Sequence, residues 1–128
     1  MNPLSCPSVV APHALLSVST TWPRTGVCAL AADGEIDVSS VAVLSRALAL
    51  ATAEAPAALV LDLARVRFLS AAGVDVVAGL FTRGRRDGFA VRVVASTRLV
   101  RRVLSLVGLD QVLVVHDTLD AALNSLSV

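Results

Sequence analysis

One serine of this chain, Ser70, invites a test for nucleophilic catalysis. A hydrolase needs a histidine base and a carboxylate beside the serine, and the chain offers His13 or His116 together with Asp62 or Asp117. The residues around Ser70 do not form the G-x-S-x-G turn that presents the serine of many hydrolases. His116 also ends an apolar run, where a structural histidine is the commoner case. We therefore expect no enzymatic activity.

The sequence completes neither a metal-binding nor a phosphate-binding pattern. The two cysteines, Cys6 and Cys28, and the two histidines contain no close pair, so no common zinc site fits. Gly79 and Gly84 have the separation of glycines in a phosphate-binding loop, but Arg85-Arg86 stands where that loop needs Lys-Ser or Lys-Thr. We expect neither a metal nor a cofactor.

The cysteines raise the question of redox control. Cys28 lies in an apolar strand pattern, which is typical of a buried and inert thiol. Cys6 lies in a proline-rich leading segment, where we expect it to be exposed. A redox switch that joins the two stays open at this point, although disulfides seldom persist in the cytosol.

A helix start explains Ser70 better than catalysis does. Leu59–Leu63 is typical of a strand buried on both faces, a short turn with Arg65 and Arg67 follows, and a helix pattern begins after Ser70-Ala71-Ala72-Gly73. The Ser70 hydroxyl can accept a hydrogen bond from one of the first unpaired N–H groups of that helix. Those N–H groups and the positive end of the helix dipole favour an anion or an acidic partner. We predict a docking site here.

Composition narrows the class of protein. The chain has 128 residues, enough for one domain, and 55% of them are hydrophobic but only 3% aromatic. Eleven basic residues, all arginine as in GC-rich bacterial genomes, and ten acidic residues give a net charge of +1, which argues against nucleic-acid binding. Prolines interrupt the uncharged residues 1–23, so we expect neither a membrane span nor a signal peptide. A soluble cytoplasmic protein is the expected class.

Hydrophobic periodicity predicts strands that alternate with helices. Strands are expected at 15–22 (closed by Pro23), 27–32, 59–63, 90–95 and 112–116, with a polar corner at 33–37. Helices are expected from Ser39 or Ser40, after Ser70, from Ser96-Thr97 and after Asp117-Thr118. This β-β-α-β-α-β-α-β-α order predicts an α/β fold with a mainly parallel sheet and an antiparallel N-terminal strand. Residues 1–13 should form a flexible arm, and residues 14–128 a single domain.

The third helix is expected to divide into an apolar and a basic face. The residues predicted to face inward are Leu99, Val100, Val103, Leu104 and Val107. Arg98, Arg101 and Arg102 would form a solvated face, and the functional alternative is a rim contact to an acidic partner.

The parallel sheet predicts where a site would lie. The carboxyl ends of its strands, and the loops that follow them, lie along one edge, where ligands and partners usually bind. Four loops should meet there: 33–37, 70–73, 96–98 and 117–118. The expected site is therefore a surface built from several loops.

Three stretches of the sequence resemble the STAS domain family, named for sulphate transporters and anti-sigma-factor antagonists. Gly34-Glu35-Ile36-Asp37 follows the second expected strand, and Leu61–Gly73 is similar to the family signature D-L-(x)3-V-x-F-(x)-D-S-S-G. Leu99–Leu109 resembles the penultimate helix of the family with its terminal Gly-Leu. The resemblance covers roughly residues 15–126, nearly the whole chain.

The resemblance implies a stand-alone anti-sigma-factor antagonist. Such a protein binds an anti-sigma factor, usually a kinase-like ATPase domain, and so frees a sigma factor for transcription. The family also implies control by phosphorylation of the first serine in Asp-Ser-Ser-Gly. Aligned on Phe68 and Gly73, that serine falls on Ala71, which has no hydroxyl, while Ser70 takes the place of the aspartate. The usual switch is therefore in doubt, and Ser70 is the alternative acceptor.

The resemblance and the predicted edge select the same partner-binding residues. These are Glu35, Asp37, Ser70, Ala71, Ala72, Gly73, Asp75, Ser96, Thr97 and Arg98. The alternative function is a STAS-type scaffold or small-ligand sensing module in a stress-signalling complex. No direct contact with nucleic acid or a membrane is expected, and the sequence leaves open whether the protein forms a homodimer.

Overall fold

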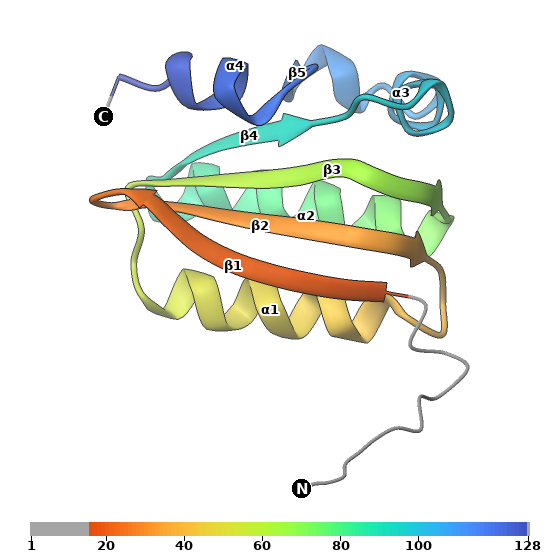
Figure 1. Cartoon of the computed structure of the whole chain (residues 1–128), viewed down its shortest axis with the longest axis horizontal. Coiled ribbons are helices and arrows are strands. Elements are labelled where there is room, and N and C mark those ends of the chain that lie inside the picture. Colours follow the sequence, from red (N-terminus) through yellow and green to blue (C-terminus); the bar gives the residue numbers. More distant parts are fainter. Residues whose placement is uncertain (1–15, 128) are drawn as a thin grey trace, which may run out of the picture.

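Five strands form one sheet in the order β1-β2-β3-β4-β5 in the computed structural model, which describes residues 16–127 (Figure 1). The elements are β1 (Leu16–Arg24), β2 (Val27–Ile36), α1 (Val41–Ala53), β3 (Ala58–Leu69), α2 (Ala71–Asp87), β4 (Ala90–Val94), α3 (Arg98–Leu106), the short 3-10 helix η1 (Leu109–Gln111), β5 (Val114–His116) and α4 (Leu119–Asn124). β1 pairs antiparallel with β2, and the remaining pairs are parallel. The predicted fold class and order of elements are confirmed. The predicted arm, residues 1–13, lies outside the described residues.

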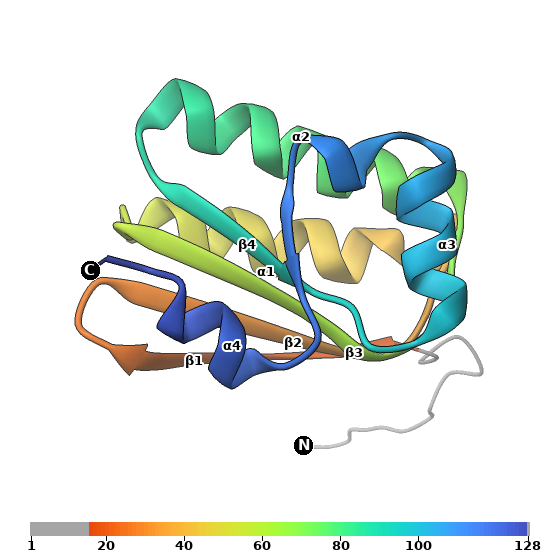
Figure 2. The same ribbon diagram turned by 90° about the horizontal axis from the view of Figure 1, so that it is seen from above.

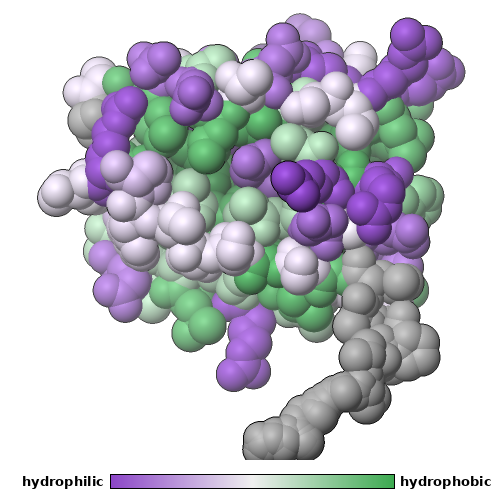
Figure 3. Space-filling model, viewed as in Figure 1, coloured by the Kyte–Doolittle hydropathy of each residue, from purple (hydrophilic) through white to green (hydrophobic). Residues whose placement is uncertain are grey.

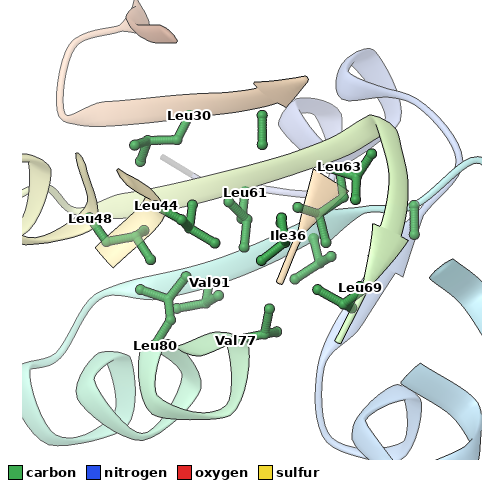
Figure 4. Packing of buried hydrophobic residues seen from close by; sticks show 14 of the residues in the cluster. Leu30, Ile36, Leu44, Leu48, Leu61, Leu63, Leu69, Val77, Leu80 and Val91 are labelled. Atoms are coloured by element: carbon green, nitrogen blue, oxygen red, sulfur yellow. The ribbon is translucent and has the colours of Figure 1, made fainter. Parts of the chain in front are cut away.

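Helices lie on both faces of the sheet (Figures 1 and 2). α1, α2 and α3 pack on one face, here called the inner face. Figure 4 shows how leucines and a valine of α1 and α2 meet the buried residues of the strands. α4 packs on the opposite, outer face, against β3, β4 and β5. Because α4 has only six residues, it shares a buried cluster with Val27 and Ala29 at the start of β2, whereas the outer face further along β2 is exposed at Ala31.

Two strand ends lie further along the chain than the sequence predicted. β2 runs on to Ile36, so Asp33 lies in the strand and not in a polar corner. β3 runs on to Leu69, so Arg65 and Arg67 lie in the strand and not in a turn. Their guanidinium nitrogens lie 3.8 and 3.5 Å from the carboxylate oxygens of Asp33. The predictions were wrong because a strand with one face open to water tolerates charged residues.

The first strand also runs on, through Pro23 to Arg24, and Pro23 does not close it as predicted. β1 is an edge strand, and its pairing with β2 is irregular between Thr21 and Arg24, which is where a proline is tolerated. In Figure 3 much of the surface along β1 is pale, of intermediate hydropathy, as its serines and threonines lead one to expect.

β3 carries two extra residues relative to β2. Ala31 pairs with Asp62 and Asp33 with Arg65, so two steps on β2 face three on β3. The same displacement recurs between Gly34 and Glu35, whose partners are Val66 and Phe68. Each irregularity is a bulge that bends the strand and increases its twist. Both bulges lie between Asp62 and Phe68, shortly before β3 ends and α2 begins.

The predicted faces of α3 are only partly correct. Val100 and Leu104 are buried on the inner face, as expected. Leu99 and Val107, which were expected to be buried, are 44% and 52% exposed. A helix of nine residues that covers the end of the sheet has neighbours on a narrow stripe alone, so its flanking apolar residues stay in solvent.

Candidate functional site

The parallel strands β2, β3, β4 and β5 end along one edge of the sheet, here called the carboxyl edge (Figure 1). Each strand end is followed by a short polar connection, beginning with Asp37, Ser70, Ala95 and Asp117 respectively. The first connection is shorter than predicted because β2 extends to Ile36. The connections of the carboxyl edge are joined to one another in two pairs.

The connection after β2 is a rigid corner built on Asp37. Its Oδ1 accepts hydrogen bonds from the Ser39 hydroxyl (2.7 Å) and from the N–H groups of Ser39 (2.9 Å) and Ser40 (3.0 Å). The Ser40 hydroxyl is buried, accepts from the Asp37 N–H (3.0 Å) and donates to the Glu35 carbonyl oxygen (2.7 Å). The hydrogen bond from the Ser39 hydroxyl, supported by the two N–H groups, lowers the pKa of Asp37. The corner therefore holds a carboxylate in a fixed place.

The start of α2 is capped as predicted. Ser70 is the N-cap residue, and its hydroxyl accepts a hydrogen bond from the Gly73 N–H at 3.4 Å. Ala71, the first residue of the helix, is exposed, and Ala72 is half-buried. This end of the helix therefore presents small apolar side chains to solvent.

Gly73 allows the start of α2 to pack closely against the ends of β2 and β3. A β-carbon placed on Gly73 would lie 2.5 Å from Leu69 Cδ1 and 2.7 Å from Ile36 Cγ2, closer than van der Waals contact allows. The Ser70 N–H also donates to the Ile36 carbonyl oxygen at 2.9 Å. The connections after β2 and β3 therefore form one continuous rigid surface.

The start of α3 forms a second rigid surface with the connection after β5. Thr97 is the N-cap residue, and its hydroxyl accepts from the Val100 N–H at 3.3 Å. The Ser96 hydroxyl donates to the carbonyl oxygen of Asp117 at 2.7 Å. Arg101 pairs with the Asp117 carboxylate, and its Nε donates to the Ala95 carbonyl oxygen at 2.7 Å. Arg98 and Arg102 are exposed to solvent, as predicted for that face of the helix.

The structure therefore brings the predicted site residues together in two groups. Glu35, Asp37, Ser70, Ala71, Ala72, Gly73 and Asp75 belong to the first, and Ser96, Thr97 and Arg98 to the second. Gly73 is the one member that is buried, so it shapes the surface without being available for contact. Asp75 is exposed on the second turn of α2.

Sequence reasoning overlooked the exposed apolar residues at the carboxyl edge. Val38 is 84% exposed in the corner after β2, and Phe68 is 45% exposed near the end of β3. Leu99, predicted to be buried, joins them at the start of α3. Val38 stands between the polar residues Asp37 and Ser39, outside any periodic apolar pattern, and that signal would have identified it.

The residues considered for a catalytic triad do not meet. Asp62 pairs with Val94 and Val94 with His116, so Asp62 and His116 lie in one row, two strands or about 10 Å apart. Ser70 follows Asp62 by eight residues, at the end of β3. His13 lies outside the described residues.

The cysteine pairing stays a prediction. Cys28 is a free, buried thiol on the inner face of β2, and burial raises its pKa. Cys6 lies outside the described residues. Within residues 16–127 no group of three His, Cys, Asp or Glu side chains is placed to hold a metal ion. No helix in the same range is both long and apolar enough to cross a membrane.

Comparison with known proteins agrees with this architecture. A family model described as "STAS domain" matches residues 23–122. The chain is 36% identical over 106 residues to the anti-sigma-F factor antagonist RsfB of Mycobacterium tuberculosis, covering 81% of this chain and 84% of RsfB. It is 32% identical to RsfA, an anti-sigma-F factor antagonist of the same organism, over 98% of this chain and 99% of RsfA. A crystal structure of an anti-sigma factor antagonist from Mycobacterium paratuberculosis superposes with a TM-score of 0.79 at 32% identity, over 86% of this chain and 92% of that one.

Proposed function

Because the chain belongs to the STAS domain family, we propose that it is an anti-sigma-factor antagonist, which binds an anti-sigma factor and so releases the sigma factor that the anti-sigma factor holds. The observation that carries the proposal is the match to RsfA, which extends over nearly the full length of both chains. The chain then acts by occupying a surface of its partner, in the cytoplasm, and performs no chemistry. A kinase-like ATPase domain is the proposed type of partner.

The carboxyl edge is the proposed docking surface. Its two groups of residues are held by hydrogen bonds to neighbouring strands, so little conformational entropy is lost when a partner binds. Exposed apolar side chains, among them Ala71, Phe68 and Leu99, provide surface that gains by leaving water. Asp37 and Arg98 provide opposite charges that orient the partner.

Phosphorylation at the usual position is not available to this chain. Ala71 is exposed at the start of α2, where the family signature has its phosphorylated serine, and it offers no oxygen to a kinase. The neighbouring Ser70 hydroxyl is engaged as the helix cap. A phosphate on Ser70 would add about −1.5 to −2 charges at the docking surface. We therefore propose that the protein binds its partner without a phosphorylation switch at Ala71.

The test is binding to the anti-sigma factors of the same genome, beginning with those related to anti-sigma-F factors. We expect Ala71→Glu, which places charge where a phosphate would otherwise sit, to weaken binding at least about tenfold. Ala121→Glu is the matched control, because Ala121 is exposed on α4 on the outer face of the sheet. Gly73→Arg is unsuitable, because the buried Gly73 leaves no room for a side chain.

Failure of every anti-sigma factor to bind would overturn the proposal and favour the alternative of a scaffold or small-ligand sensing module. If Ala71→Glu binds the partner as tightly as the control Ala121→Glu does, the carboxyl edge is not the docking surface. Incubation with a kinase-like partner and ATP, followed by intact-mass measurement, tests Ser70 as an acceptor. We expect no added phosphate. Size-exclusion chromatography of the free protein tests for a homodimer.

A further inference from the structure

The positive charges of α3 lie where they destabilise the helix. Arg98, Arg101 and Arg102 fall within the first five of its nine residues, and its first turn contains no acidic residue. The amino end of a helix is its positive end, so cations there are unfavourable. Like charges three and four residues apart also repel. α2 follows the ordinary rule, since its terminal arginines, Arg85 and Arg86, lie in the last turn.

The three arginines surround a hollow of about 510 Å³ beside α3, here called the arginine hollow. Ser96 and Ser105 add hydroxyl groups to its wall, and Leu104 and Val115 add apolar surface. The hollow therefore combines cations, hydrogen-bonding groups and an apolar wall within one concave surface. This combination fits a peptide segment that carries both acidic and aliphatic side chains.

Two of the three arginines are available to a ligand. Arg101 is taken up by Asp117 and by the Ala95 carbonyl oxygen. Within residues 16–127 neither Arg98 nor Arg102 forms an ion pair, and both are exposed. Asp110 also lines the hollow but is not paired with them. Placing two unpaired arginines near the positive end of a helix costs stability, and proteins tolerate such costs chiefly at functional sites.

We infer that the arginine hollow binds an acidic segment of the anti-sigma factor. The inference rests on the proposed function and names the chemistry of the partner at one half of the docking surface. Ser96 and Arg98 belong to both the hollow and the carboxyl edge, so the hollow adjoins the second group of the proposed docking residues. Nucleic acid is disfavoured because the hollow contains no aromatic side chain on which a base could stack.

Charge reversal at Arg98 separates this inference from a purely structural role. Arg98→Glu removes a cation from the positive end of α3 and adds an anion, so we expect the Tm to rise by about 2 °C. The same change should weaken binding to the anti-sigma factor at least about tenfold, mainly through slower association at low salt. Arg102→Glu should weaken binding similarly. More stable protein with weaker binding is a result that misfolding cannot produce.

Arg85→Glu is the matched control. It makes the same change in net charge at the far end of α2, where Arg85 lies over the ring of Phe81 at 5.9 Å. We expect the opposite result: a lower Tm, because an anion at the carboxyl end of a helix is unfavourable, and binding within about twofold of wild type.

The outcomes distinguish the inference from the function on which it rests. If wild type binds an anti-sigma factor and Arg98→Glu binds equally well, the function stands and the inference is overturned. If no anti-sigma factor binds, the function is overturned, and hexaglutamate becomes the probe in NMR titration of the free protein. Shifts at Ser96, Ser105 and the arginines that vanish in Arg98→Glu would then support an acidic ligand, and their absence would overturn the inference.

Discussion

The starts of α2 and α3 lie on the same edge of the sheet and obey the same capping rule, but they are built for different purposes. Each has a hydroxyl residue as its N-cap, Ser70 or Thr97, and neither has an acid in its first turn. α2 then continues with alanine and a glycine that has no free space around it, whereas α3 continues with arginines around a hollow. Close packing is therefore the main feature of the surface at the start of α2, whereas positive charge is the main feature of the surface at the start of α3.

This difference shows that the same short capping pattern can serve different roles, depending on the elements packed around it. The cap hydrogen bonds are nearly the same, at 3.4 and 3.3 Å. The start of α2 follows β3, which lies in the middle of the sheet, and so its first turn is pressed against Ile36 and Leu69. The start of α3 follows β4, next to the short last strand, and solvent reaches its side chains. Three predictions test the comparison.

The largest effect is expected from a side chain at Gly73. Gly73→Val should lower the free energy of unfolding by about 3 kcal/mol, because the branched Ile36 cannot move aside. Gly79→Val is the control on the same helix, where an added β-carbon meets nothing within 4 Å, and it should change stability by less than about 0.5 kcal/mol. Urea unfolding measures both values. Equal losses would mean that the start of α2 is not specially packed.

A smaller effect is expected from removing the caps. Ser70→Ala and Thr97→Ala should each cost about 1 kcal/mol, because each leaves one N–H without its acceptor. Near-equal losses in chemical denaturation would confirm that the two helix starts share the capping rule and differ only in what surrounds them. A loss at Ser70 several times that at Thr97 would mean that the cap of α2 is part of its packing.

The smallest effect concerns the corner after β2 and is lost in acid. Hydrogen bonds from Ser39 and Ser40 lower the pKa of Asp37 in the folded protein, so its carboxylate adds stability above about pH 4. That contribution is lost as the pH falls through the lowered folded pKa. We expect wild type to have a higher Tm than Asp37→Asn near neutrality and the difference to shrink below about pH 4. A pH-independent difference would show that the charge contributes nothing.

The local features of the site could be predicted from the sequence alone. Ser70 was predicted to be a helix cap, and the next two helices were predicted to begin at Ser96-Thr97 and at Asp117-Thr118, because a cap depends on residues within one turn. The structure has cap hydrogen bonds at Ser70, Thr97 and Thr118. The order of strands and helices followed from periodicity in the same way. Features set by contacts within a few residues were therefore predictable.

Features that depend on which face is covered were not predictable. Asp33, Arg65 and Arg67 were taken as signs of turns, although they lie in strands, because nothing in the sequence says that α4 leaves part of the outer face open. Leu99 was expected in the core for a related reason. The arginine hollow needs α3, the residues beside η1 and β5 in their final places, so its shape could not be read from a helix pattern.

The two bulges of β3 bear on how related chains should be compared. They make the distance along the backbone from Asp62 to the edge longer than an even strand would require, and a relative without one of them would reach the same place with fewer residues. Gly73 is a firmer point of reference, since Ile36 and Leu69 dictate its position. Counting two residues back from that glycine, and not forward from the aspartate, identifies the position that tells whether a given homologue can receive a phosphate.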